Sequence, residues 1–297
     1  MKKLIYLLAV ILPLASCLRL DSNLYNNAKI DKYKWDDYYG AVDFYLPQSY
    51  NISPANMNEL TLVSKDTVSN SNYSIKGLYI GDINTIAQDT VILYLHGNRD
   101  HMDFYWPRAK LLANVGSKYR FGVLMIDYRG FGLSEGEPTE EGMYEDVTAA
   151  LEWLKGKGVS KDRLVVYGFS LGSAAATKLL AEPRSSLVPS KLILENPFAS
   201  AEVMVQDASR LAMPASFFTN VKVDVAEKIK SIKQPFMLLS SAEDKFLKPE
   251  SHANLVSKNY NGIYKEVHSI PGADHSTLQV KWGFESYQKA IEDFIVK

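Results

Sequence analysis

The feature that most constrains the fold is the run over residues 165–176, Val-Val-Tyr-Gly-Phe-Ser-Leu-Gly-Ser-Ala-Ala-Ala. An apolar strand leads there into a Gly-x-Ser-x-Gly turn, and small residues that favour a helix follow. Ser170 would occupy a sharp strand-to-helix turn, in which Gly168 and Gly172 leave room for the neighbouring strand and helix. The helix would direct the backbone amide of Leu171 toward negative charge that forms beside the serine. The run therefore predicts a nucleophilic serine suited to acyl transfer.

Short apolar segments alternate with helical patterns from residue 59 onward, which is typical of an α/β fold with a mostly parallel sheet. The eight expected strands are residues 60–63, 75–80, 91–95, 122–126, 164–167, 192–194, 236–240 and 264–268. Helical patterning is expected at residues 104–114, 140–155, 173–181, 250–257 and 284–296. Because no helix separates the first three strands, we expect an antiparallel start joined by turns such as residues 65–72. The sequence predicts one domain over residues 59–297.

One interval in this domain, residues 199–233, is longer than a simple crossover between strands. We interpret it as a small helical cap that covers the site after the sixth strand. The apolar side chains expected to bind substrate are Phe198, Met204, Phe217 and Phe218. The alternative is that these side chains only pack the extra helices against the body, since apolar helical spacing usually marks a core.

The first 16 residues have the layout of a secretory signal peptide, with two lysines followed by an apolar run over residues 4–15. This run is too short to span a bilayer as a permanent helix. Residues 14–17, Leu-Ala-Ser-Cys, resemble the lipobox of bacterial lipoproteins. That resemblance implies cleavage before Cys17 and attachment of fatty acyl groups such as palmitate to this cysteine. The alternative is an ordinary signal peptide with a chance cysteine.

An acylated Cys17 would hold the protein on a membrane of the bacterial cell envelope, because several acyl chains bind a bilayer firmly. In enterobacteria an aspartate after the cysteine retains lipoproteins in the inner membrane, so Leu18 favours the outer membrane. Residues 17–58 are rich in Asp, Asn, Lys and Tyr and show no sustained period. We expect them to form a tether that packs loosely on the body.

Charge and composition exclude several classes of function. The formal net charge is −1, and removal of residues 1–16 with their two lysines makes it about −3. No cluster of Lys and Arg forms a stripe that could neutralise phosphates, so nucleic acid is not an expected partner. A single cysteine excludes an internal disulfide, and the five histidines lack the spacing of zinc ligands. We therefore expect neither a metal nor a cofactor.

Four motifs follow one another along the chain, at residues 94–98, 127–136, 168–173 and 195–198. They read Tyr-Leu-His-Gly-Asn, Asp-Tyr-Arg-Gly-Phe-Gly-Leu-Ser-Glu-Gly, Gly-Phe-Ser-Leu-Gly-Ser and Glu-Asn-Pro-Phe. In this order they resemble the Bem46-like and related serine hydrolases of the α/β-hydrolase superfamily. The resemblance covers residues 59–297 and implies an α/β-hydrolase fold. It also implies the chain order of nucleophile, acid and histidine.

His275 is the expected general base, because the turn at residues 272–276 follows the last strand and faces the carboxyl edge of the sheet. An imidazole there can accept the Ser170 proton and return it to the leaving group. Asp244, just beyond the seventh strand, is the expected orienting acid. Its neighbour Glu243 and the carboxylate of Asp274 compete for this role on position alone, and the family's pattern favours Asp244.

The resemblance also implies an oxyanion hole made by the backbone amides of Asn98 and Leu171. His96 is expected to brace the Asn98 loop, and residues 129–136 to serve as structure rather than chemistry. His101 lies close enough in sequence to that loop to touch substrate. His252 and His268 are expected to be structural.

These inferences together predict a serine hydrolase that cleaves carboxylic esters or thioesters of acyl or lipid-like substrates through an acyl-serine intermediate. A long-chain acyl group is favoured by the apolar cap, the expected membrane location and the lipid substrates of family members. The alternative hydrolase is an amidase or peptidase with the same triad. An alternative from another class is a non-catalytic hydrolase fold that binds a partner at the cell surface. The sequence does not indicate the oligomeric state.

Overall fold

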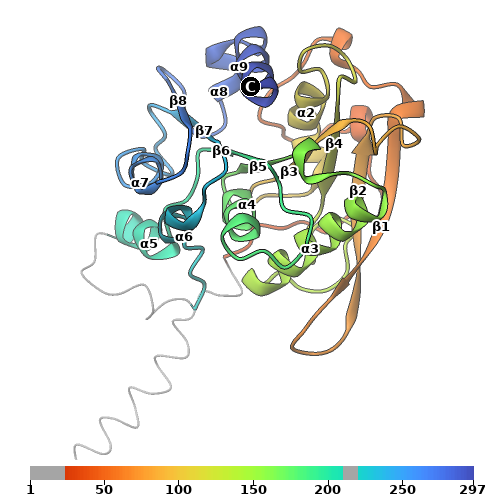
Figure 1. The fold of residues 1–297 in the computed structure, drawn as a ribbon, viewed down its shortest axis with the longest axis horizontal. Helices are drawn as coiled ribbons and strands as arrows, with labels where there is room; N and C mark the ends of the chain where they lie inside the picture. Colours follow the sequence, from red (N-terminus) through yellow and green to blue (C-terminus); the bar gives the residue numbers. More distant parts are fainter. Residues whose placement is uncertain (1–23, 210–219) are drawn as a thin grey trace, which may run out of the picture.

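Eight strands form one sheet in the computed structural model, which describes residues 24–209 and 220–297 (Figure 1). They are β1 (Met57–Lys65), β2 (Asn72–Ile80), β3 (Thr90–Leu95), β4 (Phe121–Ile126), β5 (Leu164–Phe169), β6 (Lys191–Glu195), β7 (Phe236–Ser241) and β8 (Lys265–Ile270). Their order in the sheet is β1-β2-β4-β3-β5-β6-β7-β8. β2 pairs antiparallel with β1 and β4, and the other pairings are parallel. The predicted α/β-hydrolase architecture with an antiparallel start is confirmed.

Helices cover both faces of this sheet (Figure 1). On one face lie α3 (Glu140–Gly156), α4 (Gly172–Ala181), α6 (Val225–Lys228) and α7 (Ala253–Asn259). On the other face lie α2 (Met102–Ala113), α8 (Leu278–Trp282) and α9 (Phe284–Val296). Each face has its own hydrophobic core, so strands such as β4 and β5 are buried throughout and read as continuous apolar runs.

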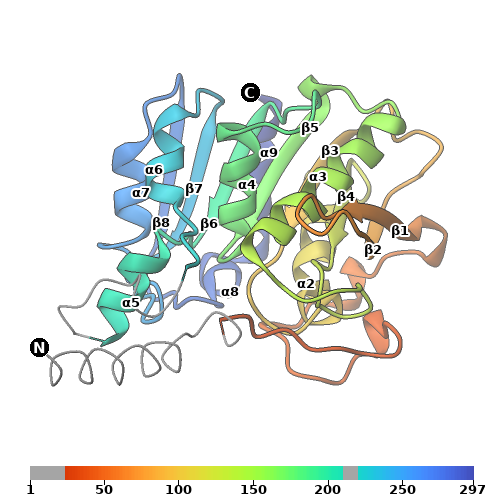
Figure 2. The ribbon, with the colours of Figure 1, turned by 90° about the horizontal axis from the view of Figure 1, so that it is seen from below.

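Local sequence explains where two of the longest helices form. Thr139 caps α3, because its hydroxyl accepts a hydrogen bond of 2.9 Å from the Gly142 amide. The amphipathic α9 buries Tyr287, Ile291, Phe294 and Ile295, at the spacing of one helical face. Figure 2 shows a further helix, α5 (Ala201–Ser209), below the strands together with the first described residues. These two segments are far apart in sequence, and both lie at the same end of the strands.

The part of the expected tether that is described packs closely on the body. Asp36 accepts hydrogen bonds from Trp106 at 3.0 Å and from Lys110 at 2.5 Å. Asp43 forms a buried ion pair of 2.9 Å with Arg108. The sequence suggested loose packing because residues 24–56 have no apolar period. The contacts are made instead by single side chains that anchor to α2, and such anchors leave no periodic signal.

A buried arginine braces the loop at residues 129–136. Arg129 forms ion pairs of 2.9 Å with Glu145 and with Asp146, and one of 3.0 Å with Asp66. Gly132 has φ +51°, and a Cβ atom there would lie 2.0 Å from the Asp127 carboxylate. These contacts give the loop the structural role that its glycines suggested.

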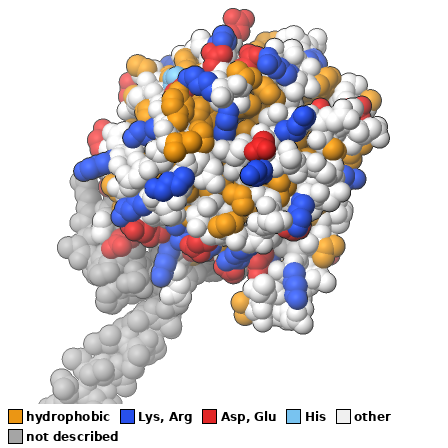
Figure 3. Space-filling model, viewed as in Figure 1, with side chains coloured by type: hydrophobic (Ala, Val, Ile, Leu, Met, Phe, Trp, Pro, Cys, Tyr) orange, Lys and Arg blue, Asp and Glu red, His pale blue; other side chains and the backbone are white. Residues whose placement is uncertain are grey.

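The surface does not carry a continuous basic stripe on the face drawn in Figure 3, where Lys and Arg side chains are dispersed. None of the helices formed by residues 24–209 and 220–297 is long and apolar enough to cross a membrane. Residues 1–16, Cys17, Phe217 and Phe218 lie outside the described residues.

Candidate active site

Ser170 lies at the turn between β5 and α4, in the left-handed region of backbone conformation with φ +50°. Few non-glycine residues adopt this region, so the surrounding turn must hold the serine there. A Cβ atom on Gly172 would lie 2.0 Å from the carbonyl oxygen of Leu95, and one on Gly168 would lie 2.7 Å from that of Gly172. Both glycines of the motif are therefore required by close backbone contacts.

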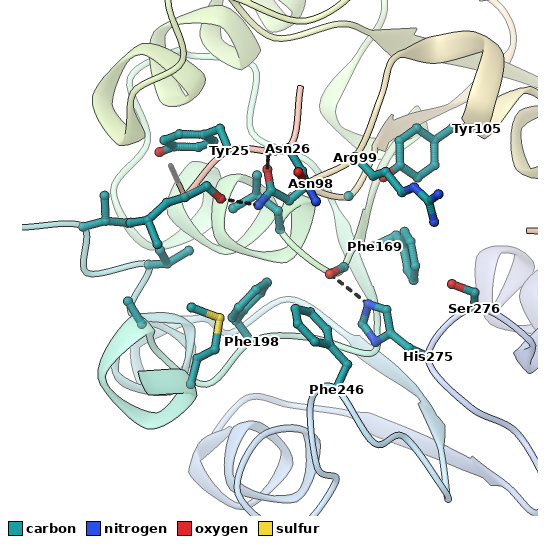
Figure 4. Close-up of a pocket in the computed structure, with 18 of the residues that line it drawn as sticks. Tyr25, Asn26, Asn98, Arg99, Tyr105, Phe169, Phe198, Phe246, His275 and Ser276 are labelled. Carbon is teal, nitrogen blue, oxygen red and sulfur yellow. Dashed lines mark hydrogen bonds between the residues drawn. The ribbon is translucent and has the colours of Figure 1, made fainter. Parts of the chain in front are cut away.

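A row of hydrogen bonds joins Ser170 to His275 and Asp244. Nε2 of His275 lies 3.0 Å from the Ser170 hydroxyl (Figure 4), and Nδ1 lies 2.6 Å from Oδ2 of Asp244. Ser170 and Asp244 are buried, whereas His275 is partly exposed. When Nδ1 carries the ring proton and donates a hydrogen bond to the carboxylate, Nε2 is unprotonated and can accept the serine proton.

Asp244 alone among the three carboxylates considered from sequence reaches the imidazole ring. Its second oxygen accepts hydrogen bonds from the amides of Phe246 at 2.9 Å and Leu247 at 2.8 Å. Asp274 accepts instead the amides of Lys245 and His275, which lower the pKa of its carboxyl. Glu243 is exposed and accepts the amide of Gly272 at 3.0 Å.

Aromatic rings enclose the histidine on two sides. The Phe169 ring lies 5.3 Å from the His275 ring, and the Phe246 ring lies 5.2 Å from it, centroid to centroid. Phe169 is fixed in turn by the buried guanidinium of Arg108, which lies 3.8 Å from its ring centroid. The imidazole is thereby held in one orientation while its edge stays open to the cavity.

A cavity of about 690 Å³ opens at Ser170 and His275. Figure 4 shows Phe198 and Tyr25 on one side of His275 and Arg99, Tyr105 and Ser276 toward the other. The apolar lining comes mainly from the start of the described chain, from α5 and from the segments before and after it: Leu24, Tyr25, Phe198, Ala201, Met204, Val205, Val221 and Val223. Two of the four expected substrate-binding residues, Phe198 and Met204, thus line the cavity. The other two are among the residues not described.

The two expected oxyanion donors border the same cavity as the serine. Leu171 precedes the first turn of α4, and Asn98 follows the end of β3 by three residues. Gly97 permits this loop to pack closely on Tyr105, because a Cβ atom at residue 97 would lie 2.9 Å from the Tyr105 hydroxyl. The carboxamide of Asn98 does not face the serine and bonds instead to Leu24 and Asn26.

The remaining histidines occupy structural positions. His96 is fully buried, with Nε2 3.2 Å from Asp127 and its ring stacked on Tyr105, so it braces the loop as expected. His101 packs against the Tyr38 ring and is not among the residues that line the cavity. His252 is buried where its Nδ1 accepts the Ala199 amide at 2.9 Å. Within the described residues, no three His, Cys, Asp or Glu side chains come together as metal ligands.

Comparisons with known proteins identify the family of this chain. Residues 87–224 match the profile of the family described as "Serine aminopeptidase, S33". Protein bem46 of Schizosaccharomyces pombe is 32% identical over 209 residues, which is 69% of this chain and 67% of the yeast protein. The chain belongs to the Bem46-like α/β hydrolases. A second member of this group, the α/β hydrolase domain-containing protein WAV2 of Arabidopsis thaliana, is 28% identical over 277 residues, covering 85% of this chain and 84% of WAV2.

Solved structures confirm the fold of this Bem46-like hydrolase. The esterase Pf2001 of Pyrococcus furiosus aligns with a TM-score of 0.65 and 18% identity, over 92% of this chain and 96% of the esterase. A bromoperoxidase of Bacillus anthracis aligns with a TM-score of 0.59 and 14% identity, over 80% of this chain and all of the bromoperoxidase. The family identifies the chain as a hydrolase, which implies a small-molecule substrate.

Several cavity residues of this Bem46-like hydrolase carry no sequence signal. Leu24, Tyr25 and Asn26 lie in the segment expected to be a loose tether, and Phe246 lies two residues after Asp244. Its position close to Asp244 is the one feature of the sequence that could have identified Phe246 as a cavity residue. Nothing in the sequence says that the first three of these residues reach the serine.

Proposed function

We propose that this hydrolase cleaves carboxylic esters or thioesters of acyl or lipid-like substrates through an acyl-Ser170 intermediate. The observation that carries the proposal is the hydrogen-bonded row of Ser170, His275 and Asp244 at one side of a largely apolar cavity. Such a row supplies a nucleophile, a base and an orienting acid, and the apolar lining suits an acyl chain.

In the first step the Ser170 oxygen attacks the carbonyl carbon of the substrate while its proton passes to Nε2 of His275. The π electrons of the carbonyl move onto its oxygen, and the amides of Asn98 and Leu171 are the proposed donors to that oxyanion. Asp244 stabilises the imidazolium through Nδ1. Collapse of the intermediate expels the alkoxide or thiolate, which takes the proton from Nε2.

In the second step water replaces the leaving group. His275 accepts a proton from this water as its oxygen attacks the acyl carbon, and the second tetrahedral intermediate expels the Ser170 oxygen. The serine regains its proton from Nε2 and the carboxylic acid leaves. The same residues thus serve both halves of the reaction, with His275 alternating between base and acid.

The test is hydrolysis of p-nitrophenyl esters from acetate to palmitate by the full chain, with Ser170→Ala as the matched control. We expect activity that the substitution abolishes. Labelling of Ser170 by a fluorophosphonate without ester hydrolysis would leave the nucleophile in place and refute the ester substrate class. No labelling and no hydrolysis would favour the non-catalytic, surface-binding alternative.

Amides are the second candidate class of substrate, and the matched family's description as a serine aminopeptidase favours it. The triad can cleave amides when His275 protonates the leaving amine. Amino-acid p-nitroanilides distinguish the classes, because a peptidase would hydrolyse them faster than esters of fatty acids. We expect the reverse order.

We also propose that Cys17 is lipidated and anchors the hydrolase to the bacterial cell envelope, with the outer membrane favoured. The lipobox-like residues 14–17 support this location. Cys17→Ser should release the protein from the membrane fraction or leave an uncleaved precursor. Unchanged fractionation and unchanged incorporation of labelled palmitate would count against the anchor.

A further inference from the structure

The first described residues cross beside the loop that carries Asn98. Residues 24–30, here called the strap, form parallel bridges with Asp100 and with Gly132. The Ala28 amide donates to the carbonyl oxygen of Asp100 at 3.1 Å, and the Asp100 amide donates to that of Asn26 at 2.9 Å. The strap is therefore hydrogen-bonded to the body at Asp100, two residues after Asn98, the proposed oxyanion donor.

Both ends of the Asn98 carboxamide are bound by the strap. Its Oδ1 accepts the Asn26 amide at 3.1 Å, and its Nδ2 donates to the carbonyl oxygen of Leu24 at 2.5 Å (Figure 4). Two hydrogen bonds to one planar group restrict rotation of the side chain and, through it, of the backbone from which it extends. Because the Asn98 amide is a proposed oxyanion donor, the strap sets the direction in which that donor points.

The strap also forms part of the cavity wall. Leu24, Tyr25 and Asn26 line the cavity, and Tyr25 packs against the hydrophobic core on the α4 face. Phe198 and Met204 supply apolar lining to the same cavity. An acyl chain that extends from Ser170 along this apolar lining would contact the same residues that hold the Asn98 side chain.

We propose that residues 24–26, the first part of the strap, are a positioning element of the active site. Leu24 and Asn26 orient Asn98 for oxyanion stabilisation, and the side chains of Leu24 and Tyr25 confer preference for long-chain acyl esters or thioesters. The inference rests on the proposed function and adds the part of the chain that sets its rate and its acyl-chain selectivity.

The orienting role is tested in the full chain with two substitutions that remove opposite sides of one hydrogen bond. Asn26→Pro deletes the amide donor, because proline has no N–H. Asn98→Ala deletes the acceptor and, in addition, the Nδ2 donor to Leu24. An alkyl trifluoromethyl ketone reports the oxyanion: the Ser170 oxygen adds to its carbonyl carbon, the π electrons move onto oxygen, and the proton passes to His275. Ligands of this kind measure transition-state stabilisation.

We expect each substitution to lower both kcat for p-nitrophenyl acetate and the affinity for the ketone by about 10- to 100-fold. This effect is smaller than the one expected from loss of a whole oxyanion donor. KM should change less than about threefold, because ground-state contacts are kept. The double variant should be no worse than Asn98→Ala alone, since Asn98→Ala already removes the hydrogen bond that Asn26→Pro deletes.

The matched control is Asn27→Ala, which removes the 2.6 Å hydrogen bond from Asn27 to the carbonyl oxygen of Gly130. This bond fastens the strap without touching Asn98, so we expect a lower Tm with kcat and ketone affinity preserved. Suppose that, at a comparable loss of Tm, Asn26→Pro and Asn98→Ala lower the affinity for the ketone no more than Asn27→Ala does. The strap is then only structural and the proposal is wrong.

Selectivity is tested with Leu24→Ala, which keeps the carbonyl oxygen that Asn98 binds. We expect kcat/KM for palmitate to fall about tenfold relative to acetate, as befits loss of a partly buried leucine side chain. An unchanged chain-length profile would overturn the selective role. A wild-type chain that neither hydrolyses esters nor takes a fluorophosphonate label would overturn the proposed function itself, and that result is visible before any variant is compared.

Discussion

The side-chain amide of Asn196 donates a hydrogen bond of 2.8 Å to the carbonyl oxygen of His275. The same nitrogen donates to the Ser241 hydroxyl at 2.9 Å, and Oδ1 accepts the Ser241 amide at 2.7 Å. Asn196 therefore ties the end of β6 to the end of β7 and to the loop of the histidine. Its φ of +42° lies in a region that asparagine tolerates better than most residues.

Replacement of Asn196 should lower both stability and activity. Asn196→Gly keeps the backbone conformation accessible but leaves the Ser241 hydroxyl and amide and the His275 carbonyl oxygen without their hydrogen-bond partner. We therefore expect a loss of about 1–3 kcal/mol in the free energy of unfolding. We expect kcat to fall about tenfold, because the His275 imidazole is no longer held in position for catalysis. Asn196→Ala should be about 1 kcal/mol less stable again, because alanine is strained at positive φ. Urea denaturation and ester hydrolysis measure both effects, and a glycine variant as stable as wild type would contradict them.

Asp244 and Asp274 offer a matched pair for the orienting acid. Asp244→Asn should reduce kcat by about 10⁴-fold, because an amide cannot hold the tautomer in which Nε2 of His275 is the acceptor. Asp274→Asn keeps a side-chain oxygen for the two amides that Asp274 binds, so its kcat should stay within about threefold of wild type. Steady-state kinetics on one ester settle the assignment, and similar losses in both variants would refute it.

Two glycines should respond oppositely to alanine. Gly172→Ala places Cβ 2.0 Å from the carbonyl oxygen of Leu95, and we expect a loss of at least about 1–3 kcal/mol in the free energy of unfolding together with lost activity. Gly156 ends α3, and a Cβ there meets nothing within 4 Å. Gly156→Ala should therefore gain about 0.5–1 kcal/mol. Thermal unfolding distinguishes the two, and a Gly172→Ala variant with unchanged Tm would show that the turn yields easily.

His252 should make stability fall in mild acid. Burial lowers the pKa of His252 despite the nearby carboxylates of Asp207 and Asp244, and the positive charges of Lys248 and a protonated His275 lower it further. The unfolded chain therefore takes up a proton first as the pH drops below the ordinary histidine value of about 6.5, and the folded state loses stability until its own lowered pKa is reached.

The measurement is Tm from pH 8 to pH 5 for wild type and for His252→Asn, whose side-chain oxygen can still accept the Ala199 amide. We expect the variant to lose less Tm over this range than wild type. Equal slopes would assign the acid sensitivity to other groups.

The strands and the serine turn could be predicted because their signals are local. Strands β3 to β7 are buried on both faces and read as apolar runs, and the contacts of Gly168 and Gly172 require glycine at fixed spacing. The antiparallel start followed from the absence of a helix between β1, β2 and β3.

The wall of the cavity could not be predicted in the same way. Leu24 and Asn26 hold Asn98 through backbone groups, which every residue possesses, so no side-chain pattern marks them. Asp36 and Asp43 bind partners on α2 that lie 65 to 74 residues away in sequence. Pairings of this kind depend on the assembled tertiary structure and leave no periodic trace in the segment itself.

The contacts of the strap join segments that are far apart in the chain. Its contacts with Asn98 and Gly130 span 72 to 103 residues, so a large loop must close before they form. During synthesis the strap leaves the ribosome before any of its partners exist, and it can dock fully only after the turn at Gly132 has followed. The earliest described residues of the chain thus wait for partners that are made 72 to 103 residues later.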